Sequence, residues 1–382
     1  MRIGIDARLW NETGVGRYVR NLVSNLVLIN SRNEYVLFIH PSIRKGMNLS
    51  NVKCQMSIVD ADFPWHSISE QVNFPKVLNM ENLDLVHFPY FSVPIFYKRP
   101  YIITLHDLIV KNYATGRAST LPYPLYLAKR LGYKAVLSNA VRKSKKIIVP
   151  SNAVRDEVLK AFPSINSDKV EVIYEGGFGS NIKNKKFNLP AGKAGIKNIE
   201  REYFVRVGNY YPHKNIENLL FAFKMLINDF ETRHVKLVLV GKKDFFFKKI
   251  EKLVLSLDLK ENIIFLEDVD DQELISLYQN SKGVVVPSFM EGFSLTSVEA
   301  LSVGSIVIAS DIPVHREVCE ACAIYFNPND PDEIRKRMEE VFKLTKESRS
   351  ELIKEGLEQS KKFSWKKMAK ETLGIYKSQL NQ

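Results

Sequence analysis

The segment VVPSFMEGFSLTSVEALSVGSIVIASD, residues 285–311, carries two glutamates, Glu291 and Glu299, spaced eight residues apart. Glu291 and Gly292 follow the apolar run GVVVPS, which indicates a buried strand, and a helix is expected to begin around residues 294–296. The amide groups at the start of such a helix form a site for an anion. Two carboxylates on either side of this turn therefore suit a ligand that has both an anionic group and hydroxyls.

This anion site also needs a cation, because a helix dipole contributes only about 0.3–1 kcal/mol to holding a negative charge. The amides that the helix start would present belong to Phe293, Ser294 and Leu295. In VRVGNYYPHKN, Lys214 follows the strand-ending Gly208 by six residues and opens the next expected helix. A lysine in such a place is commonly a solvated surface charge, but the strand-end position directs this one toward the ligand. Lys214 is the predicted cation, with His213 or Arg206 as helpers.

Two motifs in the first half of the chain also follow expected strands. TGVGRY contains Gly14 and Gly16, which would let a ligand approach the backbone closely. It is not a dinucleotide fingerprint, because Val19 stands at the third small position and the second strand ends in FIHPS without an acidic residue. TLHDL places His106 and Asp107 at the carboxyl end of a strand. A lone histidine is often structural, but this position favours a functional role.

Other candidate clusters have simpler interpretations. Asp60 and Asp62 in VDADF have the DxD spacing of carboxylate metal sites, but such patterns are common and we expect turn or surface residues. Cys319 and Cys322 form a CxxC that follows His315. A zinc site would need a fourth ligand, usually in a second cysteine pair, so a helix end with small buried residues is expected. We predict neither a metal nor a cofactor.

The elements that must position these residues belong to a globular chain. The 382 residues suit two domains, and their apolar and charged fractions exclude disorder on a large scale. The sequence has no run of eighteen apolar residues, and MRIGIDARLW reads as a buried strand and not as a signal peptide. Three cysteines fit a reducing compartment. These features predict a cytoplasmic protein.

The net charge of +12 is unevenly distributed. Lys and Arg outnumber Asp and Glu by 23 to 14 over residues 1–178 and by 5 to 1 over 179–200, whereas residues 201–382 are balanced at 27 to 28. The segment from Ala118 to Arg155 has no acidic residue. Its basic residues include Lys129, Arg130, Lys134, Arg142, Lys143, Lys145 and Lys146. Nucleic acid, an anionic membrane surface or a phosphorylated substrate would each explain this excess.

Short apolar runs alternate with helical patterns twice along the chain, which predicts two α/β domains with parallel, doubly wound sheets. The first covers residues 1–178 and the second residues 201–363. Between them, residues 179–200 are rich in Gly, Asn and Lys and form a linker or mobile loop. Residues 364–382 form a last helix. We expect the two domains to face each other across a cleft, with ligands at the carboxyl ends of the strands.

These motifs together resemble those of the retaining, nucleotide-sugar-dependent glycosyltransferases of the large family 4, which have the GT-B fold. PSFMEGFSLTSVEALSVGSIVIASDIPVHREV is similar to the E-x7-E region of that family, and VGNYYPHKN to its phosphate-binding loop. TGVGRY resembles its N-terminal glycine loop, and TLHDL its active-site histidine motif. FSWKKMAKETL resembles the last helix, which crosses back to the first domain. The resemblance spans nearly the whole chain.

The resemblance implies a role for each matching residue. In the second domain, Glu291 would bind hydroxyls of the donor sugar and Glu299 the ribose, and Lys214 with the amides after Gly292 would neutralise the diphosphate. The loop around Glu267–Val269 would hold the base. The first domain would bind the acceptor, with His106 beside the sugar and Gly14 and Gly16 in the loop that lines the reaction centre. His106, Glu291 and Lys214 are the predicted catalytic residues. The resemblance also implies a reaction that needs no metal.

The sequence departs from the family pattern at two places. Asn209 follows the glycine of the phosphate loop where many relatives have Arg, so Arg206 or His213 would have to supply a second cation. Ser294 and Thr296 stand where Gly and Pro are usual. VHREV and TGVGRY look most like mannosyltransferases of surface-polysaccharide assembly, which favours GDP-mannose as the donor.

We therefore expect an enzyme that transfers a hexose to a lipid-linked or polysaccharide acceptor, with the basic helix near 121–146 docked on the inner face of a membrane. Two alternatives stay open. The basic half would suit a nucleic-acid-binding protein, although the chain has no basic helix-turn-helix. The paired nucleotide-binding folds would suit a dinucleotide-dependent oxidoreductase, although the fingerprint is incomplete.

Overall fold

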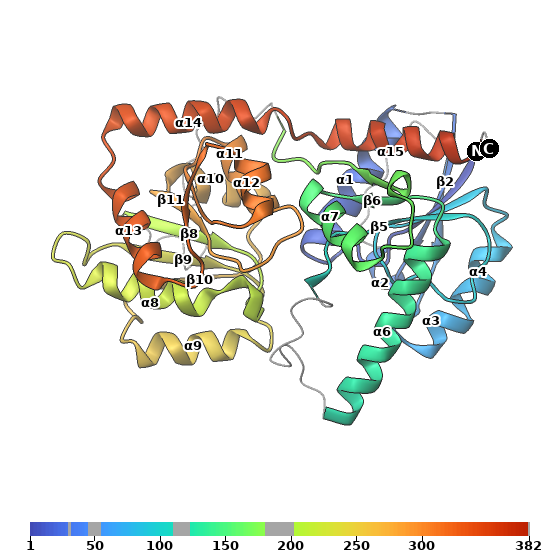
Figure 1. The fold of residues 1–382 in the computed structure, drawn as a ribbon, viewed down its shortest axis with the longest axis horizontal. Helices are drawn as coiled ribbons and strands as arrows, with labels where there is room; N and C mark the ends of the chain where they lie inside the picture. Colours follow the sequence, from blue (N-terminus) through green and yellow to red (C-terminus); the bar gives the residue numbers. More distant parts are fainter. Residues whose placement is uncertain (30–31, 45–54, 110–122, 180–201, 381–382) are drawn as a thin grey trace. The chain divides into compact units, whose positions relative to one another are not determined.

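The computed structural model describes the chain in five stretches (Figure 1), which are residues 1–29, 32–44, 55–109, 123–179 and 202–380. The predicted linker over 179–200 lies outside the described residues from residue 180 onward. So do Lys45, Lys53, Lys111 and Arg117 in the other gaps, and residues 121 and 122 of the expected basic helix.

The chain divides into two compact units. Unit 1 comprises Met1–Glu175 together with Trp365–Gln382, and unit 2 comprises Gly176–Ser364. The boundaries expected from the sequence, after residues 178, 200 and 363, stay predictions at the level of single residues.

Unit 1 contains a parallel sheet with helices packed around it. Its described strands are β1 (Arg2–Asp6), β2 (Glu34–Ile39), β3 (Gln55–Asp60), β4 (Leu85–Phe88), β5 (Tyr101–Thr104), β6 (Ile147–Val149) and β7 (Val170–Val172). Its described helices are α1 (Gly14–Ile29), α2 (Pro41–Arg44), α3 (Ile68–Val72), α4 (Phe74–Met80), α6 (Tyr123–Lys143), α7 (Asn152–Ala161), the short η1 (Ser167–Lys169) and α15 (Trp365–Leu380).

The strand order in the described part of unit 1 is β3-β2-β1-β4-β5-β6-β7, with every neighbouring pair parallel. The chain runs outward from β1 to β3 on one side and from β4 to β7 on the other. The order therefore reverses between β1 and β4, and ligands of doubly wound folds bind outside the carboxyl ends of the strands at such a point.

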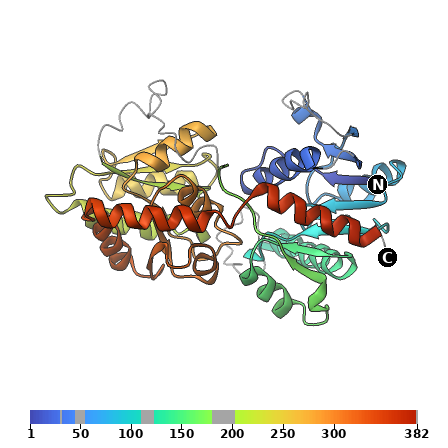
Figure 2. The same cartoon turned by 90° about the horizontal axis from the view of Figure 1, so that it is seen from above.

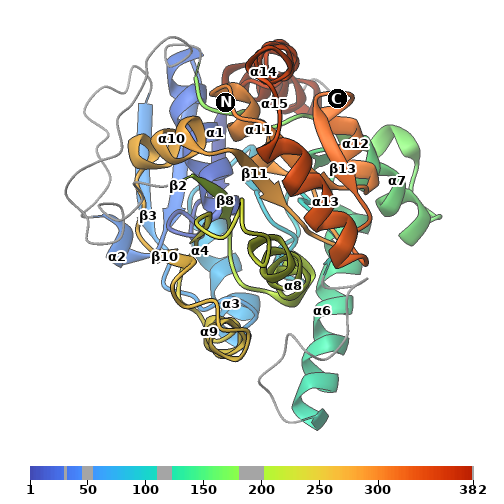
Figure 3. The same ribbon diagram turned by 90° about the vertical axis from the view of Figure 1, so that its left-hand side faces the viewer.

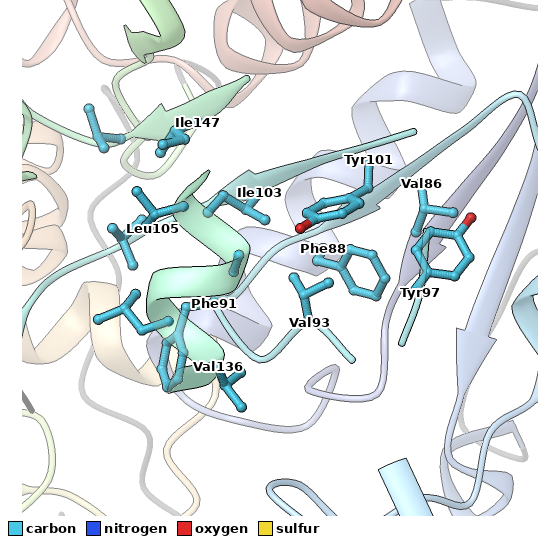
Figure 4. Packing of buried hydrophobic residues seen from close by; sticks show 14 of the residues in the cluster. Val86, Phe88, Phe91, Val93, Tyr97, Tyr101, Ile103, Leu105, Val136 and Ile147 are labelled. Atoms are coloured by element: carbon cyan, nitrogen blue, oxygen red, sulfur yellow. The ribbon is translucent and has the colours of Figure 1, made fainter. Parts of the chain in front are cut away.

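The core of unit 1 follows from its apolar strands. Ile3 and Ile5 of β1 and Ile102 and Ile103 of β5 are fully buried, as expected for strands covered on both faces. Figure 4 shows part of this core, in which Phe91 lies beside Val136 of α6. The loops that follow β4 and β5 are therefore anchored by packing close to where each strand ends.

Unit 2 repeats this architecture. Its described strands are β8 (Tyr203–Val207), β9 (Lys236–Val240), β10 (Ile263–Leu266), β11 (Gly283–Val286), β12 (Val307–Ser310) and β13 (Ala323–Phe326). Its described helices are the short η4 (Pro212–Lys214), α8 (Ile216–Ile227), α9 (Phe247–Ser256), α10 (Asp271–Asn280), α11 (Leu295–Ser302), α12 (Pro313–Cys319), α13 (Pro331–Phe342) and α14 (Lys346–Ser360).

The strand order in the described part of unit 2 is β10-β9-β8-β11-β12-β13, again with all neighbours parallel. The order reverses between β8 and β11, where Gly283 pairs with Phe204 and Val284 with Val205. The loops after these two strands carry Lys214 and Glu291. The topology thus brings two segments more than seventy residues apart to one edge of the sheet.

Helix starts in unit 2 follow local rules. Asp330 caps α13, and its side chain accepts hydrogen bonds from the amides of Asp332 and Glu333. Asp270 and Glu273 form a reciprocal capping box at α10. Figure 3 shows α13 beside α8, and these two helices are in extensive contact.

The last helix, α15, belongs to unit 1 and packs along α1 (Figure 2). Its Tyr376 hydroxyl lies 2.7 Å from Nδ1 of His87 in β4, and Nε2 of His87 lies 2.8 Å from Oγ1 of Thr104. All three side chains are buried. This agrees with the predicted return of the chain to the first domain. Across the described residues, no helix combines the length and apolar character that crossing a bilayer requires.

Candidate functional site

The loop after β8 has a fixed shape. Gly208 has a φ of +131°, a conformation that residues with a side chain rarely adopt. The Arg206 guanidinium donates to the carbonyl oxygens of Gly208 and Asn209, both at 2.6 Å. Arg206 is only 2% exposed, so in this structure it supports the loop from beneath. This placement does not support the predicted contact between Arg206 and a bound phosphate.

The same loop ends at Asn215, which has a left-handed conformation with φ of 56°. Its side-chain amide donates to the carbonyl oxygens of Pro287 at 2.9 Å and Pro328 at 2.7 Å. Lys214 is the last residue of η4, and α8 begins two residues later, at Ile216. The sequence had suggested that the helix would begin at the lysine itself. Asn215 joins the lysine loop to the end of β11.

Lys214 and Glu291 meet at this edge of the sheet. The Nζ atom of Lys214 lies 2.7 Å from Oε1 of Glu291, and the two side chains are 20% and 13% exposed. The hydroxyl of Ser288 donates to the same carboxylate oxygen at 2.7 Å. The amide of Phe289 donates to the carbonyl of His213, which ties the two loops together. A cation and a carboxylate, largely shielded but still reachable, thus lie side by side.

The charges of this pair affect the neighbouring ionisable groups. Burial by itself would raise the pKa of Glu291, but the charge and hydrogen bond of Lys214 outweigh it and lower the pKa to about 2. Burial, together with the charge of Lys214, lowers the pKa of His213 to about 4. His213 is therefore neutral at pH 7. The expectation that it supplies a second cation is not supported near neutral pH.

The helix that follows the glutamate turn begins close to where the sequence predicts. α11 starts at Leu295, and its N-cap Ser294 has a left-handed conformation with φ of 63° and ψ of 53°. Such a conformation favours glycine, which is the residue usual in the family pattern. The Ser294 hydroxyl lies 2.7 Å from that of Ser297, and Phe293 packs edge-on against Phe363. Gly292 and Phe293 therefore precede the helix, Ser294 is its N-cap and Leu295 its first residue, and an anion at these amides stays a prediction.

Glu299 occupies a more enclosed place than expected. It lies in the second turn of α11, is 4% exposed, and accepts a hydrogen bond from the Tyr278 hydroxyl at 3.3 Å. The predicted contact between Glu299 and a ribose stays a prediction. The loop expected to hold the base follows β10, where Glu267 accepts from the amide of Lys243 at 2.7 Å and pairs with its ammonium at 3.1 Å. Val269 is half-buried in this loop.

His106 in unit 1 is held on both sides. Its Nδ1 lies 3.1 Å from a carboxylate oxygen of Glu175, and its Nε2 lies 3.1 Å from the carbonyl of Pro89. The Tyr18 ring contacts the imidazole edge-on, with 4.8 Å between ring centres. Both ring nitrogens face protein acceptors, so in this structure His106 links the loops after β4, β5 and β7.

The two glycines of the N-terminal loop differ. A Cβ atom on Gly16 would lie 2.6 Å from the carbonyl oxygens of both Leu9 and Trp10, whereas one on Gly14 would meet no atom within 4 Å. The protein backbone itself therefore requires glycine at position 16. Packing against the protein's own backbone therefore explains the glycine at position 16, and the expected ligand contact there stays a prediction. The space beside Gly14 is open.

The remaining candidates lie where the simpler interpretation places them. Asp60 ends β3 and pairs with Arg44 at 3.5 Å, and Asp62 is exposed on the surface. Cys319 is buried at the end of α12, and burial raises the pKa of its thiol. Among the described residues, no group of three or more His, Cys, Asp and Glu side chains is arranged to hold a metal ion.

Sequence reasoning missed three residues that shape this site. Ser288 directly follows the apolar run GVVVP and lies three residues before Glu291. This short spacing between a hydroxyl and a carboxylate was the signal available in the sequence. Asn215 follows Lys214, and asparagine is one of the few residues that adopt a left-handed conformation readily. Tyr278 lies in α10, whose contact with α11 no sequence pattern reveals.

Comparisons with known proteins define the class. Residues 13–176 match the family model described as Glycosyltransferase Family 4, and residues 192–359 match the model described as Glycosyl transferases group 1. With its two parallel, doubly wound sheets, the chain belongs to the family 4 glycosyltransferases and has the GT-B fold. It is a glycosyltransferase, and neither the nucleic-acid-binding nor the oxidoreductase alternative is favoured.

Individual relatives agree with this assignment. The chain is 28% identical over 267 residues to the O-antigen chain mannosyltransferase RfbU of Salmonella typhimurium, a match that covers 70% of this chain and 67% of the relative. It is 25% identical over 384 residues to the O-antigen chain mannosyltransferase B of Escherichia coli, with 96% of each chain covered. Among solved structures, Anabaena HepE in complex with UDP and glucose shares the fold, with a TM-score of 0.77, 16% identity and coverage of 99% and 100%.

Proposed function

We propose that the protein is a retaining glycosyltransferase that moves a hexose, with mannose favoured, from a nucleoside-diphosphate sugar to a lipid-linked or polysaccharide acceptor. The observation that carries this proposal is the pair of Lys214 and Glu291 beside the first turn of α11, at the point where the strand order of unit 2 reverses. The mannosyltransferase relatives of O-antigen synthesis support mannose and a surface glycan. GDP-mannose is the first donor to test.

The pair suits the chemistry of such a donor. When the bond between the anomeric carbon and the diphosphate oxygen breaks, negative charge develops on the leaving diphosphate and positive charge on the sugar ring. In this proposal the ammonium of Lys214 and the amides of residues 293–295 stabilise the diphosphate. The carboxylate of Glu291, held ionised by the lysine, accepts hydrogen bonds from sugar hydroxyls and orients the ring.

The second half of the reaction forms the new glycosidic bond. The acceptor hydroxyl oxygen bonds to the anomeric carbon on the face that the diphosphate leaves, and its proton passes to an oxygen of the released diphosphate. Atoms and charge balance without a metal ion, and the proposed reaction uses none. Glu299, the Glu267–Val269 loop and His106 keep the roles that the family resemblance gives them.

The acceptor suggests where the enzyme works. A lipid-linked acceptor lies at a membrane, and the described basic side chains of α6 and the segment after it, such as Lys129, Lys143 and Lys145, are exposed. We propose a cytoplasmic enzyme that associates with the inner face of the membrane through this helix. Anionic lipid would attract each such side chain by about 1 kcal/mol.

A thermal-shift screen with GDP-, UDP-, ADP- and dTDP-sugars tests donor binding. A ligand that binds only the folded state raises the melting temperature, by about 5–10 °C at a concentration about 100 times its dissociation constant. We expect GDP-mannose to give the largest shift. A screen in which no nucleotide sugar shifts the melting temperature would reject the proposal.

Turnover of the donor tests the site. Lys214→Ala and Glu291→Gln should each lower the rate of transfer by about 10²–10³-fold, because each removes a group aimed at developing charge or at the sugar. Lys249→Ala is the matched control, since that lysine pairs with Glu217 on the surface of the same unit. The anomeric configuration of the product, read by NMR, decides between retention and inversion.

A further inference from the structure

Unit 1 has a strand-order reversal of its own, between β1 and β4, and the loops at its carboxyl edge carry a cluster of aromatic side chains. We call Trp65, His66 and Tyr90 the aromatic ledge. Trp65 and His66 follow β3, and Tyr90 follows β4 by two residues. His66 is exposed and the other two are half-buried. The Trp65 and Tyr90 rings meet edge-on, with 5.8 Å between their centres.

The ledge is built on a buried ionic network. Arg8, only 6% exposed, donates to Asp6 at 2.8 and 2.9 Å and to Glu70 at 2.9 Å. The Arg8 guanidinium also lies 4.1 Å from the ring centre of Trp65 and so supports one face of the indole. Glu70 in turn accepts from the backbone amide of His66 at 2.8 Å. Two of the three ledge residues are therefore held in place from below.

The third ledge residue is held from the other direction. The Tyr90 ring contacts Phe91 with 4.2 Å between ring centres, and Phe91 is part of the buried core. The His66 ring stacks on the same Phe91 at an interplanar angle of 20°. Because Phe91 is 2% exposed, it serves as the fixed support on which the two partly exposed rings rest.

The ledge adjoins the predicted catalytic histidine within the same unit. Nε2 of His106 lies 3.1 Å from the carbonyl oxygen of Pro89, the residue directly before Tyr90. The carbonyl group that contacts His106 therefore belongs to the peptide bond between Pro89 and Tyr90 of the ledge. A ligand on the ledge would lie along the same strand ends as His106.

Polar groups interleave with the rings. Nδ1 of His66 lies 3.4 Å from the Ser92 hydroxyl, which donates to the Glu70 carboxylate and so accepts from the imidazole. In that tautomer Nε2 of His66 is an acceptor, and the residue as a whole is exposed. Rings that alternate with hydrogen-bonding groups suit a pyranose, whose apolar C–H face packs on an aromatic ring while its hydroxyls reach polar atoms at the edge.

We propose that the aromatic ledge binds a sugar ring of the acceptor glycan, with the pyranose packed on Trp65 and Tyr90 and a hydroxyl donating to His66. The inference rests on the proposed function for its biological meaning, since a glycosyltransferase needs an acceptor saccharide. The location of the site rests on unit 1 alone. A simple glycoside therefore suffices as a probe.

The test uses the full chain labelled with 5-fluorotryptophan, which gives one fluorine resonance for each of its three tryptophans. Trp65→Phe assigns the resonance of Trp65. Titration with methyl α-D-mannopyranoside, methyl α-D-glucopyranoside and methyl N-acetyl-α-D-glucosaminide should move the Trp65 resonance, and leave that of Trp365 in α15 in place. Tyr90→Ala should weaken the fitted affinity roughly tenfold, the loss typical when an aromatic stacking partner is truncated.

Phe96→Ala is the matched control, because Phe96 is 62% exposed in the same loop after β4 but outside the ledge. Its titration should equal that of the unmodified protein. A Trp65 resonance that no glycoside moves, or a Tyr90→Ala titration that matches the Phe96→Ala one, overturns the inference. If Tyr90→Ala has a lowered melting temperature, Tyr90→Leu, which keeps a larger apolar side chain than alanine but not the flat ring, replaces it.

The donor screen on the same protein separates the two proposals. A glycoside that moves Trp65 in a protein that binds no nucleotide sugar supports the ledge and rejects the proposed function. A nucleotide sugar that raises the melting temperature, with no glycoside response at Trp65, leaves the proposed function standing and rejects the ledge.

Discussion

The ammonium nitrogen of Lys214 lies 2.7 Å from Oε1 of Glu291, and the two side chains reach each other from the loops that follow β8 and β11. Each therefore neutralises the other before any ligand binds. A donor diphosphate would compete with Glu291 for the lysine, and a sugar hydroxyl would compete with the lysine for Glu291. The attraction between the two charges therefore holds both side chains in place before a ligand binds.

A double-mutant cycle measures this coupling. Lys214→Met leaves the shielded Glu291 carboxylate with a hydrogen bond from the Ser288 hydroxyl but without its cation, so the free energy of unfolding of unit 2 should fall by about 1–3 kcal/mol. Glu291→Gln likewise leaves the Lys214 ammonium without a charged partner. The double variant should lose less free energy of unfolding than the two single variants lose together, because neither charge is then left without its partner.

Denaturant unfolding followed by circular dichroism gives the three values. Lys249→Met is the control, since Lys249 pairs with Glu217 at a more exposed place, with 65% and 32% of the two side chains accessible, and should lose only about 0–1 kcal/mol. Strict additivity in the Lys214 and Glu291 cycle would show that the two charges do not interact in solution.

The buried His87 predicts how stability depends on pH. Burial lowers the pKa of its imidazole to about 3, whereas the unfolded chain has a histidine pKa of about 6.5. Between these two values the unfolded state binds a proton that the folded state does not. The free energy of unfolding should therefore fall as the pH falls below about 6.5, by up to about 1.4 kcal/mol per pH unit from this residue.

Melting temperatures of the unmodified protein and of His87→Gln, measured from pH 7.5 to pH 5, check this. The variant should melt lower at pH 7.5, because it cannot satisfy both the Tyr376 hydroxyl and the Thr104 hydroxyl in the same way, but its loss on acidification should be smaller. Equal slopes for His87→Gln and the unmodified protein would contradict the prediction.

Much of this fold was predictable because its strands are continuous apolar runs. GVVVPS, SIVIAS and VKLVLVG each became a parallel strand, since β-branched residues buried on both faces leave few other solutions. The start of α13 was predictable for a local reason, because the Asp330 side chain accepts from the first free amides and Pro331 at the first helical position has no amide hydrogen to satisfy. The strand order, which brings β8 beside β11, depends on packing far along the chain and no short pattern shows it.

The site was predictable in part for the same reasons. Lys214 and Glu291 both follow apolar strands, so a parallel sheet places them at one edge. The roles of Arg206 and His213 were not predictable, because they depend on burial: the sequence shows two basic residues near a glycine, whereas the fold directs Arg206 to backbone carbonyls and lowers the pKa of His213. Charge in a sequence does not reveal desolvation in a fold.

The two glycines of TGVGRY should respond differently to the same substitution. Gly16→Ala would force a methyl group against the carbonyl oxygens of Leu9 and Trp10, so the melting temperature should fall, with a loss of about 1–3 kcal/mol. Gly14→Ala adds a methyl group in open space at the first residue of α1 and should stabilise by about 0.4–1 kcal/mol.

Both variants should then be assayed for donor turnover. A stable Gly14→Ala variant with full activity assigns no ligand contact to that position, whereas loss of activity in a stable protein would show that the open space beside Gly14 is used. Equal stability of the two variants would contradict the steric reason given for Gly16.

Asn215 supports the lysine loop through its backbone conformation and its side chain, and three variants separate these effects. Asn215→Gly keeps the left-handed conformation, with φ of 56°, but removes the hydrogen bonds to Pro287 and Pro328. Asn215→Ala removes the hydrogen bonds and adds backbone strain of about 1 kcal/mol or more, so it should be the least stable. Asn215→Asp keeps the shape but turns a donor into a charged acceptor facing two carbonyl oxygens, so it should also be strongly destabilised.

Because Asn215 fixes the residue next to Lys214, Asn215→Gly should raise the KM for the nucleotide sugar more than it lowers kcat, provided that the lysine binds the donor before the bond breaks. Steady-state kinetics with the donor found in the thermal-shift screen decides this. A fall in kcat with an unchanged KM would mean that the lysine acts on the leaving diphosphate alone, and unchanged kinetics would mean that Lys214 keeps its position without Asn215.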